Sequence, residues 1–250
     1  MAKVTLEAPT LADVVAARDR IRAYLPATPL RNYPSLDRLT GAEVLLQGRD
    51  YDEAREHCER LAEQHGYRYI HSGDEPHLIA GVGTHTLEIL EERPDIDAVI
   101  VPIGGGSGAA GTSIVAKATR PGIEVIAVQS AQAPTAHDSW RDRKLVERPN
   151  TTVAEGLSTR TAFELPQRIL RELLDDFVLI SDESILDAVA IMVEKTRTLV
   201  EPAGAAPLAA LLSLALGDRL RGKRVVLICS GANISPVQLR AVMARGKQPA

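Results

Sequence analysis

The chain has 250 residues, enough for one large domain or for a domain with a small lobe. Its apolar content of 45% and charged content of 25% are typical of a soluble globular protein. The formal net charge is −4, so no overall basic field favours nucleic acid or an anionic membrane surface. One Trp, five Tyr and two Phe are too few for a base-stacking surface.

The sequence has no feature of a secretion or membrane signal. It has no N-terminal apolar h-region and no apolar run of membrane-spanning length, which predicts a cytoplasmic protein. The two cysteines, Cys58 and Cys229, form no CxxC pair and are too few for a disulfide-rich scaffold. Cys229 ends an apolar run and is expected to be buried as a small hydrophobe, whereas Cys58 lies in a charged helical segment.

The N-terminal third mixes helical and strand-like segments. Residues 10–24 have helical spacing behind Thr10, a residue suited to cap a helix. Residues 51–66 form an amphipathic pattern that ends at Gly66, a typical C-terminal glycine. The other elements predicted here are strands at 42–47 and 67–71, and a loop with Gly81 and Gly83 that opens a helix within 77–93.

From residue 97 onward, strands alternate with helices. Continuous apolar runs indicate strands that are buried on both faces of a parallel sheet. The predicted elements are strands at 97–103, 124–130, 177–181 and 224–233, helices at 111–120, 164–176, 181–200 and 201–216, a polar loop at 131–152 and a frayed tail at 243–250. This alternation predicts an α/β fold with a doubly wound, mostly parallel sheet, in which ligands bind beyond the carboxyl ends of the strands.

The loop VPIGGGSGAAGTS at residues 101–113 is predicted to bind a phosphate group. Glycine N–H groups can all point at one anion, and the following helix adds the partial positive charge of its N-terminus. Ser107 adds a hydroxyl donor. The alternative is a tight turn whose glycines serve close packing, but five glycines among eight residues exceed what a turn requires.

The same loop satisfies GxGxxG, the dinucleotide-binding pattern, at Gly106, Gly108 and Gly111. Dinucleotide-binding proteins place an acidic residue at the end of the next strand, where it binds the ribose. Here that strand ends in Gln129 and Ser130, and no GK[ST] sequence completes a nucleotide-binding P-loop. A nicotinamide dehydrogenase is therefore disfavoured, and the pattern favours a monophosphate on a compact cofactor or substrate.

Seven segments lie in an order and spacing found in one known family. They are TLADVVAARDRIRAYLPATPL, YDEAREHCERLA, IAGVGTHTLEILEE, PIGGGSGAAG, TTVAEGLST, LVEPAGAAPLAALL and CSGANIS. Together they resemble the threonine and serine dehydratases, fold-type II pyridoxal-phosphate enzymes with a tryptophan synthase beta-like fold. The likeness covers about residues 5–236, with Glu155 where the family usually has Asp. It implies pyridoxal 5′-phosphate as cofactor and an amino acid as ligand, L-threonine or L-serine being converted to a 2-oxo acid and ammonia.

The resemblance implies a role for each matching site residue. The phosphate cradle would consist of Gly104, Gly105, Gly106, Ser107 and Gly108. Ser230 would face the pyridine nitrogen with a neutral hydroxyl, and its alternative is a simple turn serine. Gly156 and Glu201 would lie near the ring, although Glu201 is equally suited to the first turn of the following helix. The family's metal site has Gln129 and Thr135 at its matching positions, so it is predicted to be absent or altered.

The family's Schiff-base lysine is missing from this sequence. It would lie in a segment like KxENxxxTGSFKxRGA, and a loop like SAGNHG would bind the substrate carboxylate, but neither occurs. The six lysines stand in other contexts and are predicted to be surface residues: Lys3, Lys117, Lys144, Lys195, Lys223 and Lys247. Two GAEV-like strands of the family are fused at residues 41–48, as if a long internal block had been removed. The predicted division is 1–40 as the N-terminal part of the large domain, 41–80 as a remnant of a small domain that is largely missing, and 81–250 as the large cofactor-binding domain.

Without that lysine, no catalytic residue is assigned, and the cofactor is expected to be held non-covalently at most. The chain is predicted to be inactive as a dehydratase by itself. The alternative, from a different class, is a non-catalytic remnant or scaffold that binds phosphate-bearing ligands or associates with an intact paralogue. Loss of the small lobe should expose apolar surface and leave helix 51–66 with few packing partners, and a homo-oligomer is expected by resemblance. Neither a nucleic acid nor a membrane is an expected partner.

Overall fold

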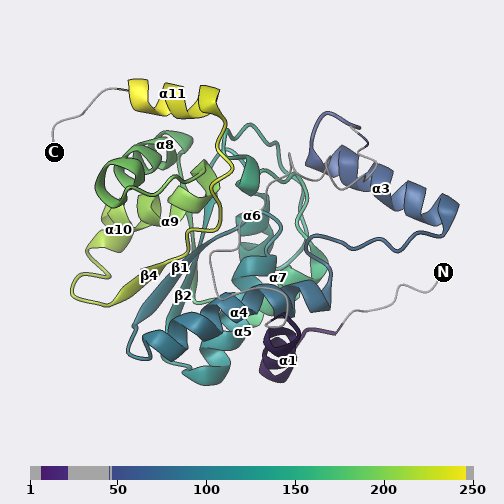
Figure 1. Cartoon of the computed structure of the whole chain (residues 1–250), viewed down its shortest axis with the longest axis horizontal. Helices are drawn as coiled ribbons and strands as arrows, with labels where there is room; N and C mark the ends of the chain where they lie inside the picture. Colours follow the sequence, from purple (N-terminus) through teal and green to yellow (C-terminus); the bar gives the residue numbers. More distant parts are fainter. Residues whose placement is uncertain (1–6, 22–44, 46, 246–250) are drawn as a thin grey trace.

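A four-stranded parallel sheet forms the centre of the molecule. The computed structural model describes residues 7–21, 45 and 47–245 (Figure 1). The strand order is β3-β2-β1-β4, with every neighbouring pair parallel. The strands are β1 (Ala98–Pro102), β2 (Glu124–Ser130), β3 (Asp176–Ile180) and β4 (Val225–Leu227). Each of these strands therefore begins within one residue of its predicted starting point.

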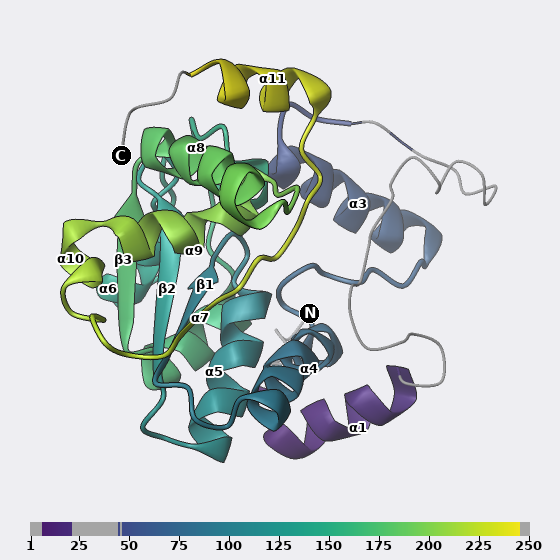
Figure 2. The ribbon, with the colours of Figure 1, turned by 60° about the vertical axis from the view of Figure 1, so that its left-hand side comes forward.

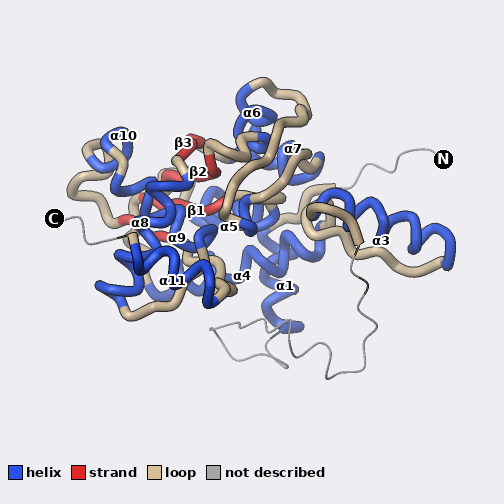
Figure 3. Tube along the Cα trace, turned by 90° about the horizontal axis from the view of Figure 1, so that it is seen from above, coloured by secondary structure: helices blue, strands red, loops and turns tan. Residues whose placement is uncertain are grey.

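Helices cover both faces of the sheet, as Figures 2 and 3 show from two directions. Side chains alternate across β1, because successive residues of a strand point to opposite faces. Ala98 and Ile100 pack with α8 (Asp182–Ile191) and α9 (Pro202–Leu212), and Val99 and Val101 pack with the cluster of the opposite face. The opposite layer consists of α4 (Pro76–Glu92), α5 (Ser107–Thr119) and α7 (Glu164–Leu173), with α1 (Leu11–Ile21) outside it. The remaining helices in the described part of the chain are α3 (Tyr51–His65), α6 (Thr135–Arg141), α10 (Leu214–Gly217) and α11 (Pro236–Ala244). Both faces are thus buried, which confirms the doubly wound α/β fold.

The predicted caps at Thr10 and Gly66 are present at the ends of their helices. Thr10 and Asp13 bond reciprocally at the start of α1, with Thr10 N donating to Asp13 Oδ2 at 2.7 Å. Gly66 ends α3 in the left-handed conformation, with φ of 70°. Ser181 accepts a hydrogen bond from Ser184 N at 3.2 Å and starts α8. The boundaries at Thr10 and Gly66 are therefore those that the sequence predicts, and Ser181 marks a third.

The predicted loop around Gly81 and Gly83 is wrong, because α4 runs through both glycines as one helix. Gly83 lies against Gly111 of α5, and a Cβ added at Gly111 would be 2.8 Å from Gly83 N. The glycines at this crossing therefore permit close approach of two helices and do not mark a break.

Two predicted strands differ from the structure. Residues 67–71 form no strand, and Tyr67 and Ile70 are exposed beside α3. The strand predicted at 224–233 is reduced to β4, which is half-buried because it pairs with β1 on one side only among the described residues. The strand predicted at 42–47 lies mostly outside the described residues, and Leu45 and Gln47 are not part of a strand.

Three further predictions, for a loop, a helix and the C-terminal tail, also need correction. The polar loop at 131–152 contains α6, which is held by tertiary contacts because Trp140 Nε1 donates to Leu170 O at 3.1 Å. The helix predicted at 181–200 ends as α8 and a π-turn at Thr196, since Arg197 adopts a positive φ of 58°. The helix α11 follows β4 and includes the start of the tail that was expected to fray.

The helix α3 projects from the body of the molecule (Figure 1). Its one buried residue is Asp52, whose carboxylate accepts from Arg160 N at 2.9 Å and from Thr161 Oγ1 at 2.7 Å. Leu45, Tyr67 and Ile70, which flank this helix in sequence, are each more than half exposed, at 59%, 65% and 57%. Within the described part of the chain, this segment has few packing partners, as expected, and a buried carboxylate attaches it to the body instead of an apolar face.

No helix in the described part of the chain is both long and apolar enough to cross a membrane.

Candidate phosphate and cofactor site

The glycine loop connects the carboxyl end of β1 to the N-terminus of α5. Ile103 N donates to Val128 O at 2.9 Å and keeps the start of the loop in register with β2. Gly106 has φ of 96°, a conformation that favours glycine, and its carbonyl accepts from Ala110 N at 2.9 Å to close the first helical turn. The N–H groups of Ser107, Gly108 and Ala109 have no intrahelical acceptor. The loop thus presents several free donors at a positive helix end, the arrangement that binds an anion.

A second reason for the glycines comes from the segment behind the loop. An added Cβ at Gly104 would overlap the carbonyl oxygen of Gly156, and one at Gly105 would overlap the ring of Phe163. At Gly106 it would be 2.9 Å from Pro166 Cβ. We call residues 156–166 the backing segment, because it contacts three successive glycines. The glycines therefore serve close packing as well, so their number alone does not establish a phosphate site.

The carboxylate of Glu201 makes its contacts with turns beyond the sheet. This residue precedes α9 but makes no side-chain cap to that helix. Its Oε2 accepts instead from Asn233 N at 3.1 Å, and its backbone N–H donates to Gly231 O at 3.1 Å. A Cβ at Gly156 would lie 3.2 Å from Glu201 Oε1. Glu201 therefore lies between the 156 turn and the turn that follows β4.

The predicted site residues are therefore brought together at one edge of the sheet. Gly104 contacts Gly156, Gly156 contacts Glu201, and Glu201 contacts Gly231, the neighbour of Ser230. Ser230 itself is exposed after β4. These segments are far apart in sequence, and they meet beyond the carboxyl ends of β1 and β4, where parallel α/β sheets bind ligands (Figure 1).

Burial raises the pKa of the Glu201 carboxyl, and the nearby charge of Glu155 raises it further. The hydrogen bond from Asn233 N acts in the opposite direction, because it favours the ionised form. The carboxyl therefore keeps its proton to a higher pH than an exposed glutamate, which makes it suited to hold a proton next to a ligand.

Replacing Glu201 by Gln is expected to change how stability depends on pH. A carboxyl whose pKa is raised on folding favours the folded state below its ordinary value of 4.5 and loses that contribution as pH rises through the raised pKa. The Glu201→Gln variant should lack this loss, because its amide oxygen still accepts from Asn233 N and does not ionise. Urea unfolding between pH 4 and 8 measures the difference, with the exposed Glu92→Gln as control. Identical pH profiles for the wild type and the Glu201→Gln variant would contradict the assignment.

Cys229 is exposed, so the expectation of a buried cysteine is wrong. The reason is the position of β4 at the edge of the described sheet: Ile228 N still donates to Ile100 O at 3.0 Å, and Cys229 lies just beyond this last bond to β1. Cys58, in the charged helix α3, is also exposed.

The two positions predicted to match the family's metal site, Gln129 and Thr135, form hydrogen bonds with other protein groups. Gln129 is fully buried, its Oε1 accepts from His137 N at 3.1 Å, and its Nε2 has no partner in the described structure. Thr135 Oγ1 donates to Arg160 O at 3.1 Å. An amide N–H group repels a cation, and the described residues contain no cluster of three His, Cys, Asp or Glu side chains. These residues do not fit a metal ion.

Among the four described lysines, none is bonded to the glycine loop. Lys117 lies near the far end of α5, where its Nζ donates to Ile123 O at 2.7 Å and to Asp175 at 2.6 Å. Lys223 pairs with Glu124 at 3.2 Å, at the amino end of β2. Lys195 pairs with Glu194 at 3.0 Å and Lys144 is exposed, while Lys3 and Lys247 lie outside the described residues.

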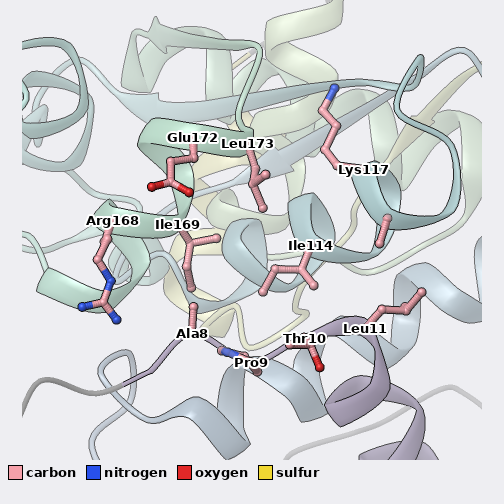
Figure 4. A pocket seen from close by; sticks show the side chains of 11 residues that line it. Ala8, Pro9, Thr10, Leu11, Ile114, Lys117, Arg168, Ile169, Glu172 and Leu173 are labelled. Carbon is pink, nitrogen blue, oxygen red and sulfur yellow. The ribbon is translucent and has the colours of Figure 1, made fainter.

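A cavity of about 450 Å³ lies elsewhere, between α5, α7 and the chain that enters α1 (Figure 4). Its floor contains Ile114, Ile169 and Leu173, and its rim contains Lys117 and Arg168. None of the predicted site residues lines it. The candidate cofactor site is therefore the open edge around the glycine loop and not this cavity.

Comparison with known proteins agrees with the geometry. The pattern of the pyridoxal-phosphate dependent enzymes matches residues 17–231. The L-threonine ammonia-lyase of Geobacter sulfurreducens is 41% identical over 207 residues, which are 82% of this chain and 51% of that protein. The L-threonine ammonia-lyase of Thermotoga maritima is 34% identical over 230 residues, or 89% of this chain and 56% of that protein. The chain thus spans about half the length of the curated relatives it matches.

Solved structures show the same fold. A threonine deaminase from T.th. has a TM-score of 0.75 and 28% identity, and the match covers 91% of this chain and 99% of that one. Maize serine racemase has a TM-score of 0.82 at 23% identity, covering 96% and 98% of the two chains, which shows the fold alone. On the family match and the geometry of the loop together, this chain belongs to the pyridoxal-phosphate dependent enzymes of fold-type II.

Proposed function

We propose that this chain binds pyridoxal 5′-phosphate non-covalently through its glycine loop, and that it does not carry out the threonine or serine dehydratase reaction by itself. Two observations together support the proposal most strongly. The free N–H groups of Ser107, Gly108 and Ala109 form an anion cradle, while none of the four described lysines contacts it.

The residues at this edge of the sheet fit the cofactor. The cradle at the N-terminus of α5 suits a phosphate group, and Ser107 adds a hydroxyl. Gly156 leaves room beside the Glu201 carboxyl, where a side chain would collide with Ala203. Ser230 supplies a neutral hydroxyl at the position assigned to the pyridine nitrogen. When bound, pyridoxal phosphate supplies an electron sink for chemistry at the α-carbon of amino acids.

The chain's own residues supply binding and orientation. The loop fixes one end of the cofactor, and Ser230 and Glu201 define the other. Without an amine placed to form a Schiff base, covalent catalysis by amine exchange is lost. The alternative, a scaffold for other phosphate-bearing ligands, uses the same cradle and differs only in what occupies the space beyond the phosphate.

The test uses purified protein and added pyridoxal phosphate. We expect saturable binding in the visible spectrum, competition by inorganic phosphate, and binding of pyridoxal that is weaker by tenfold or more, since it lacks the charged group, about the effect of one hydrogen bond to a charge. Borohydride treatment should label no lysine, and threonine should yield no 2-oxobutanoate. A labelled lysine together with threonine-dependent 2-oxobutanoate would contradict the proposal, as would preferential binding of a nicotinamide dinucleotide. Binding of inorganic phosphate without pyridoxal phosphate would favour the scaffold.

A further inference from the structure

One edge of the Phe163 ring lies against two glycines that belong to different parts of the chain. One edge of the ring is so close to Gly73 and to Gly105 that an added Cβ at either glycine would overlap it. Phe163 is only 4% exposed and stands directly before α7. Gly105 belongs to the glycine loop, whereas Gly73 belongs to the segment that leads from α3 to α4. The ring is therefore in contact with both segments, so the position of each segment depends on the ring.

A small group of residues fixes the ring from the side of Gly73. The imidazole of His71 packs edge-on against Phe163, with ring centroids 4.6 Å apart and planes at 88°. His71 Nδ1 accepts from the N–H groups of Gly73 and Asp74, each at 2.9 Å. Asp74 Oδ1 in turn accepts from Leu165 N at 2.8 Å, two residues after Phe163. We call His71, Gly73 and Asp74 the clamp.

The clamp also replaces a missing helix cap. Phe163 occupies the N-cap position of α7 but has no side-chain oxygen to offer, and it makes no side-chain cap. Asp74 supplies that acceptor from another segment of the chain, which ties α7 and the ring to the clamp. The ring, the helix start and Gly73 therefore form one packed unit behind Gly105.

We propose that Phe163 is a positioning residue for the phosphate-binding loop, held in place by the clamp of His71, Gly73 and Asp74. This inference rests on the proposed function, because it assumes that the loop binds a phosphate. The reason is steric: the same edge of the ring lies against both Gly105 and Gly73, so a shift of the ring changes the space left for the loop backbone. The N–H groups that face the anion are part of that backbone.

The clamp depends on the protonation state of His71. Two N–H groups point at Nδ1, so the clamp requires the neutral imidazole, and the imidazolium has no acceptor to offer. Burial lowers the pKa of His71, and the charge of Arg55 does the same, while Asp74 and Glu59 oppose them. The ring of Tyr69 also faces His71, at 5.8 Å. The clamp is therefore intact near neutral pH and opens in acid, below the ordinary histidine value of 6.5.

The test measures binding of inorganic phosphate at pH 7.5 by calorimetry. Phe163→Leu should weaken binding by about tenfold, the effect of losing one hydrogen bond to a charged group. Gly73→Ala should weaken it similarly, although Gly73 is not part of the loop, because its methyl group displaces the ring. The matched control is Phe177→Leu, the other phenylalanine of the chain, which is also 4% exposed but packs against His137 and Trp140. It should lose stability and keep its phosphate affinity.

A second arm follows sulfate binding from pH 5 to 8, since the charge of sulfate is constant over that range. Wild-type affinity should fall in acid, and His71→Asn should remove that fall, because its amide oxygen accepts N–H bonds and does not titrate. Unchanged phosphate affinity in folded Phe163→Leu and Gly73→Ala would overturn the inference, as would equal pH profiles for wild type and His71→Asn. Failure of the wild type to bind phosphate or sulfate would contradict the proposed function instead, so the two failures are distinguishable.

Discussion

Replacing Gly111 by alanine is expected to lower the free energy of unfolding by about 3 kcal/mol, the upper end for overpacking a core. Gly111 lies where α4 and α5 cross, and its added Cβ would be 2.8 Å from both Gly83 N and Ile79 O. Both are backbone atoms of a helix, so no side chain can turn away to relieve the overlap. Urea unfolding followed by circular dichroism measures the loss.

The matched control is Gly81→Ala in the same helix pair. Among the described residues, an added Cβ at Gly81 would meet only Ile21 Cδ1, at an ordinary 3.9 Å. Alanine is favoured over glycine inside a helix by about 1 kcal/mol, so this variant should be neutral or more stable. Equal effects of the two substitutions would show that close approach of α4 and α5 does not determine the packing.

Replacing Gly104 by alanine should reduce phosphate and pyridoxal-phosphate affinity by about 100-fold, the effect of losing two hydrogen bonds to a charged group. The added methyl group would overlap the carbonyl oxygen of Gly156, so either the loop or the 156 turn must move. Either movement separates the phosphate cradle from the Gly156–Glu201 side of the site. Calorimetric titration with inorganic phosphate measures the affinity of the phosphate cradle alone. Titration with pyridoxal phosphate measures the affinity of the cradle together with the Gly156–Glu201 side.

The control for Gly104→Ala is Gly122→Ala, since a Cβ at Gly122 meets nothing within 4 Å. It should keep wild-type affinity and stability. If Gly104→Ala stays folded and binds phosphate as tightly as the wild type, the backing segment does not hold the loop in place.

The central strands could be predicted because burial on both faces produces continuous apolar runs. The sequences around Val99 and Ile126 have this property, and both residues are fully buried. The extent of β4 could not be predicted in the same way. Its apolar sequence resembles that of a central strand, but its pairing on one side depends on what lies beside it in space.

The glycines illustrate a second limit. The sequence of Gly81 and Gly83 is compatible with a loop, and only the packing of α4 on α5 shows why a helix contains them. At Gly104 and Gly105 the sequence indicates an anion-binding loop from local composition alone. The contact with the backing segment, however, joins residues about fifty positions apart, and no local pattern carries that information.

The candidate site could be predicted only in part, because local patterns indicate its residues but not the contacts between them. The sequence is compatible with two roles for Glu201, a carboxylate in the first turn of α9 or a neighbour of the ring. It gives no sign of the observed contact, in which the Glu201 carboxylate accepts from Asn233 N. The clamp on Phe163 was not predicted, because a histidine that accepts two backbone N–H groups has no sequence signature. Resemblance to a family identified the cofactor class, whereas the contacts that hold the loop came from the structure.

The most direct test of the account is a ¹⁵N–¹H correlation spectrum recorded during titration with pyridoxal phosphate. The account predicts saturable shifts of the N–H signals of residues 105–109, reversed by inorganic phosphate and much weaker with pyridoxal. Shifts confined to other parts of the chain, or the absence of shifts at residues 105–109 on saturation with pyridoxal phosphate, would contradict it.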